Sequence, residues 1–367
     1  MNIVWFSGRS MNDLCATTQI ALATGLSKRG YNLTFVNSDT QGSHDNWPWN
    51  HQSIPNNVPR GFRSRALGKK MRKWFSSKPT EDESVALVDW RIASELVPLF
   101  QERKMPWILI DRSPPADRGL LSFLQWPSWK RSWNNVEEAE KALGCVVSKA
   151  HQTFVALKTR VNPDSIVELP AGVDLDLFQP NKRFEQFTLV YHGRLDRHRG
   201  VMALPMLLHK AQIQGIEARL ILIGEGNAFQ GLSEIAKQNS SIEVKPTVSK
   251  EILAEIISKC HVGLLPMPKQ KVWTISSPLK RSEYAACGLL IYGINHSGHQ
   301  FAGKKALEWI KLVDQEDFHD AGTAWFADLL ERDLEPLRQQ ARTFAKENLS
   351  WENTLDALEN AVLSLVQ

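Results

Sequence analysis

Residues Thr188–Val201 have the sequence TLVYHGRLDRHRGV, which predicts a strand, a turn and the start of a helix in succession. Thr188–His192 is a short apolar run typical of a buried strand, Gly193 permits a tight turn, and a helix is expected to start near Gly200. The turn between them carries Arg194, Arg197 and Arg199. Arginines at the carboxyl end of a parallel strand, ahead of a helix N-terminus, suit an anion such as a diphosphate, although a solvated basic loop is the simpler alternative.

The same strand, turn and helix rhythm runs through all 367 residues. Buried strands are expected at Asn2–Ser7, Asn32–Val36, Val85–Val88, Trp107–Asp111, Ala218–Ile223, His261–Pro266 and Leu289–Gly293. Apolar residues at helical spacing predict helices at Asp13–Arg29, Lys250–Lys259 and Leu334–Asn348. This alternation predicts an α/β protein with parallel sheets covered by helices on both faces. The stretches 39–84 and 112–134 interrupt the rhythm and are predicted to be long loops.

Composition excludes several classes of protein. Lys and Arg number 44 against 40 Asp and Glu, and a net charge of +4 is too mild to indicate a nucleic-acid-binding protein. The four cysteines lack metal-ligand spacing, which predicts reduced thiols and no zinc site. No signal peptide or apolar run long enough to span a membrane is evident, so we expect a cytoplasmic protein. The composition is also unusual in having 13 Trp and only 4 Tyr.

A second candidate site is SSPLKRSEYAACG, Ser276–Gly288. Ser276 or Ser277 is expected to cap a helix that ends at Gly288. The amides and dipole at such a helix start favour a phosphate group. Glu283 lies further along the helix, where a carboxylate can accept hydrogen bonds from a vicinal diol such as that of ribose.

Together these segments resemble the retaining glycosyltransferases of the GT-B fold, specifically glycosyltransferase family 4. The similarity is carried in series by LPAGVDLDLFQP, GRLDRHRG, LILIGEG, PLKRSEYAACG and LSWENTLDALENAV. The resemblance is strongest over residues 165–367. It implies two Rossmann-like domains with parallel sheets facing across a cleft: an acceptor domain at 1–180, a donor domain at 181–348, and a helix at 349–367 that packs back on the N-terminal domain.

The resemblance also implies roles for individual residues. Arg194 and Arg199 would contact the donor diphosphate and stabilise it as it leaves, and Glu283 would hold the donor ribose. The remaining donor-binding residues would be Gly8, Gly193, Gly224, Glu225, Thr247, Ser276, Ser277 and Leu279. The reaction would need no metal cofactor, because cationic side chains and a helix end would neutralise the leaving group.

Two departures from the family pattern affect the predicted site. Ile275 stands where the family often has a glutamate that contacts the donor sugar, so the identity of the sugar is open. The family's N-domain histidine has no clear match. Asp111 and Arg112 occupy approximately its place, and we predict a catalytic role in which the carboxylate orients or deprotonates the acceptor hydroxyl. A capping aspartate in a turn is an equally good reading of Asp111.

The basic run Arg60–Lys78 suggests how the protein binds its acceptor. Leu67, Met71, Trp74 and Phe75 form one apolar stripe on an otherwise basic helix, which is typical of a helix lying on anionic lipid headgroups. The predicted membrane and acceptor residues are Arg60, Arg63, Lys69, Lys70, Arg72, Lys73, Trp74 and Phe75. A helix that packs its stripe on its own domain is the alternative. The tryptophans at 47, 49, 126, 129 and 133 are expected to add interfacial or sugar-stacking surface.

We therefore expect a glycosyltransferase that moves a sugar from a nucleotide sugar to a glycan or lipid-linked acceptor. Its expected place is the cytoplasmic face of a membrane, bound peripherally to anionic lipid, with no nucleic-acid partner. A nicotinamide-dependent dehydrogenase is rejected, because the third glycine of the dinucleotide fingerprint would fall at Phe229. The remaining alternative is a catalytically silent sugar-nucleotide-binding homologue or scaffold.

Overall fold

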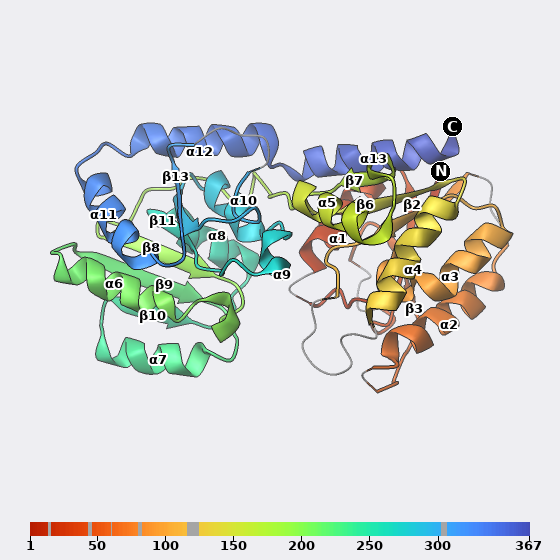
Figure 1. Ribbon diagram of the computed structural model, residues 1–367, viewed down its shortest axis with the longest axis horizontal. Helices are drawn as coiled ribbons and strands as arrows, with labels where there is room; N and C mark the ends of the chain where they lie inside the picture. The colour runs from red at the N-terminus through yellow and green to blue at the C-terminus, as the bar shows by residue number, and fades with distance from the viewer. Residues whose placement is uncertain (14–15, 43–45, 60, 80–82, 116–124, 302–306) are drawn as a thin grey trace. The chain divides into compact units, whose positions relative to one another are not determined.

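The computed structural model describes residues 1–13, 16–42, 46–59, 61–79, 83–115, 125–301 and 307–367 (Figure 1). The chain forms two α/β units. The first consists of Met1–Pro170 together with Trp351–Gln367, and the second is Ala171–Ser350. The last helix therefore packs on the unit that carries the N-terminus.

The first unit is built on a parallel sheet in the order β3-β2-β1-β4-β5-β6-β7. The first strand in sequence lies inside the sheet, and the chain runs outward from it in both directions, so the switch in strand order falls between β1 and β4. The strands are β1 (Asn2–Phe6), β2 (Asn32–Asn37), β3 (Asn50–Ser53), β4 (Ser84–Asp89), β5 (Trp107–Ile110), β6 (Ala142–Val146) and β7 (Ile166–Glu168).

Helices cover this sheet because each has an apolar side to bury. They are α1 (Thr17–Lys28), α2 (Arg63–Ser76), α3 (Trp90–Glu102), α4 (Gln125–Glu138), α5 (Lys149–Thr159) and α13 (Trp351–Val366). Leu355 of α13 packs so closely on α1 that a Cβ added to Gly25 would lie 2.5 Å from it. Arg29, just after α1, pairs with Glu352 and Asp356 of α13, each at 2.6 Å. These contacts hold the C-terminal helix, blue in Figure 1, to the first unit.

The second unit repeats the design with a parallel sheet in the order β10-β9-β8-β11-β12-β13. Its strands are β8 (Phe187–His192), β9 (Ala218–Ile223), β10 (Ile242–Lys245), β11 (Val262–Leu265), β12 (Leu290–Ile294) and β13 (Ile310–Val313). Its helices are α6 (Ala203–Ile213), α7 (Phe229–Gln238), α8 (Lys250–Ser258), α9 (Lys271–Thr274), α10 (Leu279–Ala286), α11 (Phe318–Leu330) and α12 (Glu335–Asn348). Here the order switches between β8 and β11. In open α/β sheets, ligands bind outside the carboxyl ends of the strands at this switch.

Several elements differ from the sequence-based expectation. The stretch 112–134, expected to be a loop, holds most of α4, and β3 lies within the other expected loop. The sheets also contain four further strands that the sequence analysis did not anticipate: β6, β7, β10 and β13. Most of these are short strands at or near a sheet edge. Runs of three or four residues are too short to give a clear apolar pattern in a sequence.

The tryptophan excess is mainly a core feature. Trp5, Trp107, Trp129 and Trp133 are among the largest fully buried side chains of the first unit, and Trp49 is also buried. The expectation that Trp49, Trp129 and Trp133 offer interfacial or sugar-stacking surface is therefore wrong. Large rings fill the space between sheet and helices here, and they are not available to a ligand.

Candidate active site

Two glycine turns meet at the carboxyl edge of the second sheet. Gly193 follows β8 and Gly224 follows β9, with φ values of +109° and +140°. The Gly193 amide donates to the Ile223 carbonyl at 2.9 Å, and a Cβ on Gly224 would lie 1.9 Å from the Gly193 carbonyl oxygen. Only glycine fits there. The turns therefore lie against each other beside the switch in strand order.

One carboxylate organises the arginines of the first turn. Asp196 accepts a hydrogen bond from Nε of Arg194 at 3.2 Å, and its Oδ2 lies 3.9 Å from Nε of Arg199. Burial alone would raise the pKa of Asp196, but the bonds from Arg194 and the Asn227 amide outweigh burial and lower it. The carboxylate is therefore charged, and the Arg194 side chain, 48% exposed, is oriented without being enclosed.

Arg199 is more enclosed than Arg194. Its guanidinium lies 4.5 Å from the centroid of the Trp273 ring, and its side chain is 21% exposed. Stacking on an indole fixes the plane of a guanidinium and leaves its edge for hydrogen bonding. Both arginines predicted for the donor diphosphate thus lie at the same edge of the second sheet.

The start of α10 differs from the prediction. Pro278 is the residue that precedes the helix, and no side chain caps it. The Ser276 hydroxyl donates to the Trp273 carbonyl at 2.7 Å, while the Ser277 hydroxyl accepts from the Ala171 amide at 3.1 Å. The prediction that Ser276 or Ser277 caps α10 is wrong, because the Ser276 hydroxyl bonds to the segment before the helix and the Ser277 hydroxyl bonds to Ala171 and to the Arg281 side chain. Leu279 is the first residue of the helix.

Glu283 lies under the end of β8. Its Oε2 is 3.1 Å from Nε2 of His192, the last residue of that strand, and its side chain retains 12% exposure. The His192 ring in turn packs edge-on against Tyr284 at a centroid distance of 5.3 Å. The carboxylate is therefore held next to the Gly193 turn.

Lys280 belongs to the same site, and the sequence analysis missed it. Its Nζ lies 4.7 Å from the centroid of Tyr191 and 3.4 Å from where a Cβ on Gly193 would stand. The residue is only 7% exposed, which is unusual for a lysine. The signal was its position in the first turn of α10, two residues after Pro278. Lys280 adds a third cation to the edge that carries Arg194 and Arg199.

The other predicted donor residues lie on loops at the same edge. Glu225 is exposed, and its carbonyl accepts from the Leu195 amide at 2.8 Å. Thr247, beyond the end of β10, is also exposed. Ile275, which replaces the family's glutamate, is buried at 6% exposure.

The first sheet has a polar cluster at its own switch point. The Asp89 carboxylate, at the end of β4, accepts from the Ser7 hydroxyl at 2.8 Å and from the Gly8 amide at 3.0 Å. Burial raises the pKa of Asp89, and nearby Arg9 and Arg91 oppose that rise. The amide of Gly8 therefore already has a partner. One small cavity is lined by Arg9, Gln19, Asp89, Arg91 and Arg112, among others.

Asp111 is not placed to meet an acceptor hydroxyl. It is 1% exposed, and one of its oxygens accepts from the indole nitrogens of Trp129 at 2.6 Å and Trp133 at 2.9 Å. His151 approaches the same oxygen at 3.4 Å. This geometry does not support a catalytic role for the carboxylate. The Asp111 side chain does more than cap a turn, because it links the end of β5 to α4 and α5. Arg112 is partly exposed beside it.

The apolar stripe of α2 does not face outward. Leu67, Met71 and Phe75 are buried in the first unit, and Trp74 is half-buried. A Cβ on Gly68 would lie 2.9 Å from Glu95 of α3, so the two helices pack closely. The structure thus corrects the predicted lipid-facing stripe and matches the alternative. The exposed side is basic, with Arg63, Arg65, Lys69, Lys70, Arg72 and Lys73.

Two further observations concern membranes. Arg60 lies outside the described residues, while Phe62 beside it is 74% exposed. Among the described residues, no helix is both long and apolar enough to cross a bilayer.

No protein-family model and no curated protein sequence matches the chain. Solved structures do match its fold. Sucrose-phosphate synthase from Thermosynechococcus elongatus has a TM-score of 0.77 at 17% identity, over 100% of this chain and 99% of its own. HepE from Anabaena, in complex with UDP, has a TM-score of 0.74 at 11% identity, over 99% and 100%.

WaaG, a glycosyltransferase involved in lipopolysaccharide biosynthesis, has a TM-score of 0.70 at 14% identity, over 96% of this chain and 98% of its own. At these identities the likeness concerns the fold. Each matched protein is nearly as long as this chain, and both sheets take part. The chain has the two-domain GT-B fold found in these glycosyltransferases.

Proposed function

We propose that this protein is a glycosyltransferase that uses a nucleoside-diphosphate sugar as donor. The observation that carries the proposal is the cationic edge of the second sheet, where Arg194, Arg199 and Lys280 lie beside the Gly193 turn and Glu283. Three cations beside a carboxylate suit a ligand with a diphosphate at one end and a diol nearby. HepE, of similar fold, has been solved with UDP and with UDP-glucose, which supports the same ligand class here.

The proposed chemistry breaks the bond between the anomeric carbon and the diphosphate oxygen. The bonding electrons leave with the diphosphate, and the acceptor hydroxyl oxygen forms the new bond to that carbon. Prearranged cations that meet the developing negative charge are usually the largest catalytic term. Because Asp111 is enclosed by its own donors, we assign the acceptor proton to the departing diphosphate. Retention of configuration and membership of family 4 belong to this proposal and follow from the sequence resemblance.

The acceptor is proposed to be a glycan or a lipid-linked glycan at the cytoplasmic face of a membrane. The basic side of α2 supports this, because exposed Lys and Arg attract anionic lipid headgroups. Phe62, exposed next to that helix, can enter the headgroup layer. The basic side chains of α2 and the Phe62 ring are thus proposed to contact the lipid. The buried apolar stripe anchors α2 to its own unit.

Liposome sedimentation tests the membrane proposal. A variant with Lys69, Lys70, Arg72 and Lys73 changed to Gln should sediment less with phosphatidylglycerol vesicles than the wild type, and salt should weaken wild-type binding. Lys237→Gln and Arg332→Gln, exposed in the second unit, form the matched control. Equal sedimentation of the α2 variant and the control would show that α2 does not bind the membrane.

The competing proposal is a silent homologue or scaffold that binds the nucleotide sugar without transfer. It draws on Ile275 and on the absence of an accessible base at Asp111. Incubation with UDP-, GDP- and ADP-sugars, with and without a mixture of glycan acceptors, separates the two. Acceptor-dependent release of nucleoside diphosphate supports the transferase, and NMR of the product gives the anomeric configuration. Tight donor binding with no release for any pair would favour the silent homologue.

A further inference from the structure

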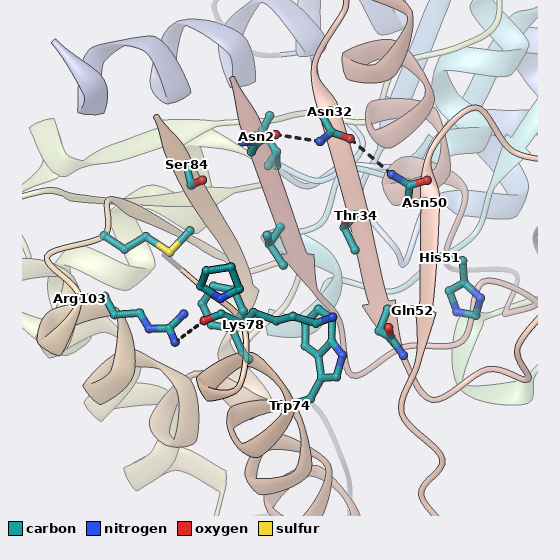
Figure 2. Close-up of a pocket in the computed structure, with 15 residues that line it drawn as sticks. Asn2, Asn32, Thr34, Asn50, His51, Gln52, Trp74, Lys78, Ser84 and Arg103 are labelled. Carbon is teal, nitrogen blue, oxygen red and sulfur yellow. Dashed lines mark hydrogen bonds between the residues drawn. The ribbon is translucent and has the colours of Figure 1, made fainter. Parts of the chain in front are cut away.

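A cavity of about 330 Å³ lies on one face of the first sheet, and the proposed transfer reaction does not use it (Figure 2). Four strands contribute their first residues to its wall: Asn2, Asn32, Asn50 and Ser84. The polar cluster of Ser7, Gly8 and Asp89 stands at the opposite, carboxyl ends of these strands. Five residue steps of strand, from Asn2 to Ser7, separate the two places by about 16 Å.

The amino-terminal part of this face is unusual because its side chains are polar and partly exposed, whereas Phe6 and Val36, further along the same face, are fully buried. Parallel sheets generally have both faces covered and apolar. On the other face, Ile3, Leu33 and Phe35 are fully buried. On the cavity side, the alternate positions near the strand starts carry Val4, Thr34 and Gln52 beside the three asparagines.

The three asparagines form one hydrogen-bonded row across neighbouring strands. Nδ2 of Asn32 donates to Asn2 at 2.8 Å, and Nδ2 of Asn50 donates to Asn32 at 3.3 Å. The row spans about 10 Å across β1, β2 and β3. Each amide has two N–H groups and an oxygen, so the bonds within the row use only part of its capacity. Such a row can follow the hydroxyls of a chain of sugar rings.

An indole and two cations complete the cavity. Figure 2 shows Trp74 and Lys78 at one end, with Arg103 nearby. Nζ of Lys78 lies 5.5 Å from the centroid of the Trp74 ring, and Arg103 donates to the Lys78 carbonyl at 2.9 Å. The lining therefore complements a ligand that carries hydroxyls and negative charge.

We propose that this cavity binds an acidic saccharide chain, one bearing carboxylate or phosphate groups, away from the transfer site. Asn2, Asn32 and Asn50 would bond the sugar hydroxyls, Trp74 would pack on a ring, and Lys78 would pair with the acid group. A lipid surface fits less well, because a row of amides borders the apolar residues of the lining, and acyl chains would leave those amides unpaired. The inference is independent of the proposed transfer activity, because it concerns binding in the absence of donor.

The test measures binding of two hexasaccharides by calorimetry: one from hyaluronan, which carries carboxylates, and cellohexaose, which is neutral. The double variant Asn50→Ala, Lys78→Ala should weaken hyaluronan binding about tenfold or more, since each lost bond is worth a factor of about 2 to 10. Its affinity for UDP should not change. Lys158→Ala, exposed on α5 of the same unit and away from the cavity, is the matched control and should bind as the wild type does.

Three outcomes would overturn the assignment. They are wild-type protein that does not bind the acidic hexasaccharide at millimolar concentration, equal binding by the double variant, or equal binding of the neutral hexasaccharide. Arg194→Ala separates the two sites: it should bind the hexasaccharide normally even where UDP binding is lost. A protein that fails to transfer sugar but retains this binding would contradict the proposed function alone.

Discussion

Oε2 of Glu283 lies 3.1 Å from Nε2 of His192, which joins the helix α10 to the end of strand β8. This contact holds a carboxylate at the place where the donor ribose is proposed to bind. Glu283→Ala should therefore weaken UDP binding about 10- to 100-fold, the range expected for losing hydrogen bonds to a charged group. Calorimetry with UDP measures it.

The control for this variant is Glu335→Ala, since that glutamate starts α12 and pairs with Arg338 at 2.8 Å on the surface. It should bind UDP as the wild type does. If Glu283→Ala and Glu335→Ala bind UDP equally well, the ribose assignment is wrong.

The close contact of the two glycine turns predicts a difference between two alanine variants. Gly224→Ala would place a Cβ 1.9 Å from the Gly193 carbonyl oxygen, whereas Gly215, at φ +81°, has nothing within 4 Å of an added Cβ. Gly215→Ala should lower the free energy of unfolding by about 1 kcal/mol, from backbone strain alone. Gly224→Ala should lower it by at least about 3 kcal/mol. Urea denaturation gives both values, and equal losses would contradict the packing described here.

The enclosure of Asp111 predicts a structural defect and no binding defect. Burial would raise its pKa, but His151 and the two indoles lower it more, so the group is a carboxylate that four donors share. Asp111→Asn should lower the free energy of unfolding by about 3 kcal/mol, because it leaves buried donors facing an amide. Asp164→Asn, on an exposed carboxylate of the same unit, should change it by less than about 0.5 kcal/mol. Unaltered stability of Asp111→Asn would reopen a catalytic role.

The comparison of sequence and structure divides along the two sheets. The second sheet was largely predictable: a central apolar strand, a glycine turn and a run of arginines fix the position of Arg194 and Arg199 by local rules. Glu283 followed from helix spacing. Lys280 did not, since its burial depends on how α10 packs against Tyr191, which lies far away in sequence.

The first unit was harder to predict because its loops fold into tertiary structure. The stripe on α2 has the same periodicity whether it meets lipid or its own domain. The burial of Leu67, Met71 and Phe75 in the structure distinguishes the two. Trp129 and Trp133 looked like interfacial residues, yet they donate to a buried carboxylate. The row of asparagines could not be predicted from the sequence, because each asparagine is the first residue of a different strand.

Protonation of His261 predicts a pH dependence of stability. The Thr188 amide donates to its Nδ1 at 3.1 Å, and burial together with nearby arginines lowers its pKa from 6.5 to about 4. Between about pH 6.5 and pH 4 the unfolded chain therefore holds a proton that the folded chain lacks. This group's contribution to stability should be complete above pH 6.5 and should fall as the pH drops toward 4.

His261→Asn is the variant that isolates this effect, because its side-chain oxygen can still accept from the Thr188 amide and does not titrate. The slope of unfolding free energy against pH in that window should be smaller in the variant than in the wild type. The difference should be at most about 1.4 kcal/mol per pH unit, which corresponds to the uptake of one proton. Identical slopes would show that His261 does not titrate as proposed.

We propose that the carboxyl edge of the second sheet holds the diphosphate of a sugar donor. Titration of UDP and GDP into the wild type, Arg194→Ala and Lys280→Met tests it most directly, with Arg332→Ala as a surface control. We predict that the wild type and the control bind one of the two nucleotides with equal affinity. Arg194→Ala and Lys280→Met should each bind it at least about tenfold more weakly, with unchanged unfolding curves. Equal affinity in all four proteins, or no binding of either nucleotide by the wild type, would show that this edge does not hold the donor diphosphate.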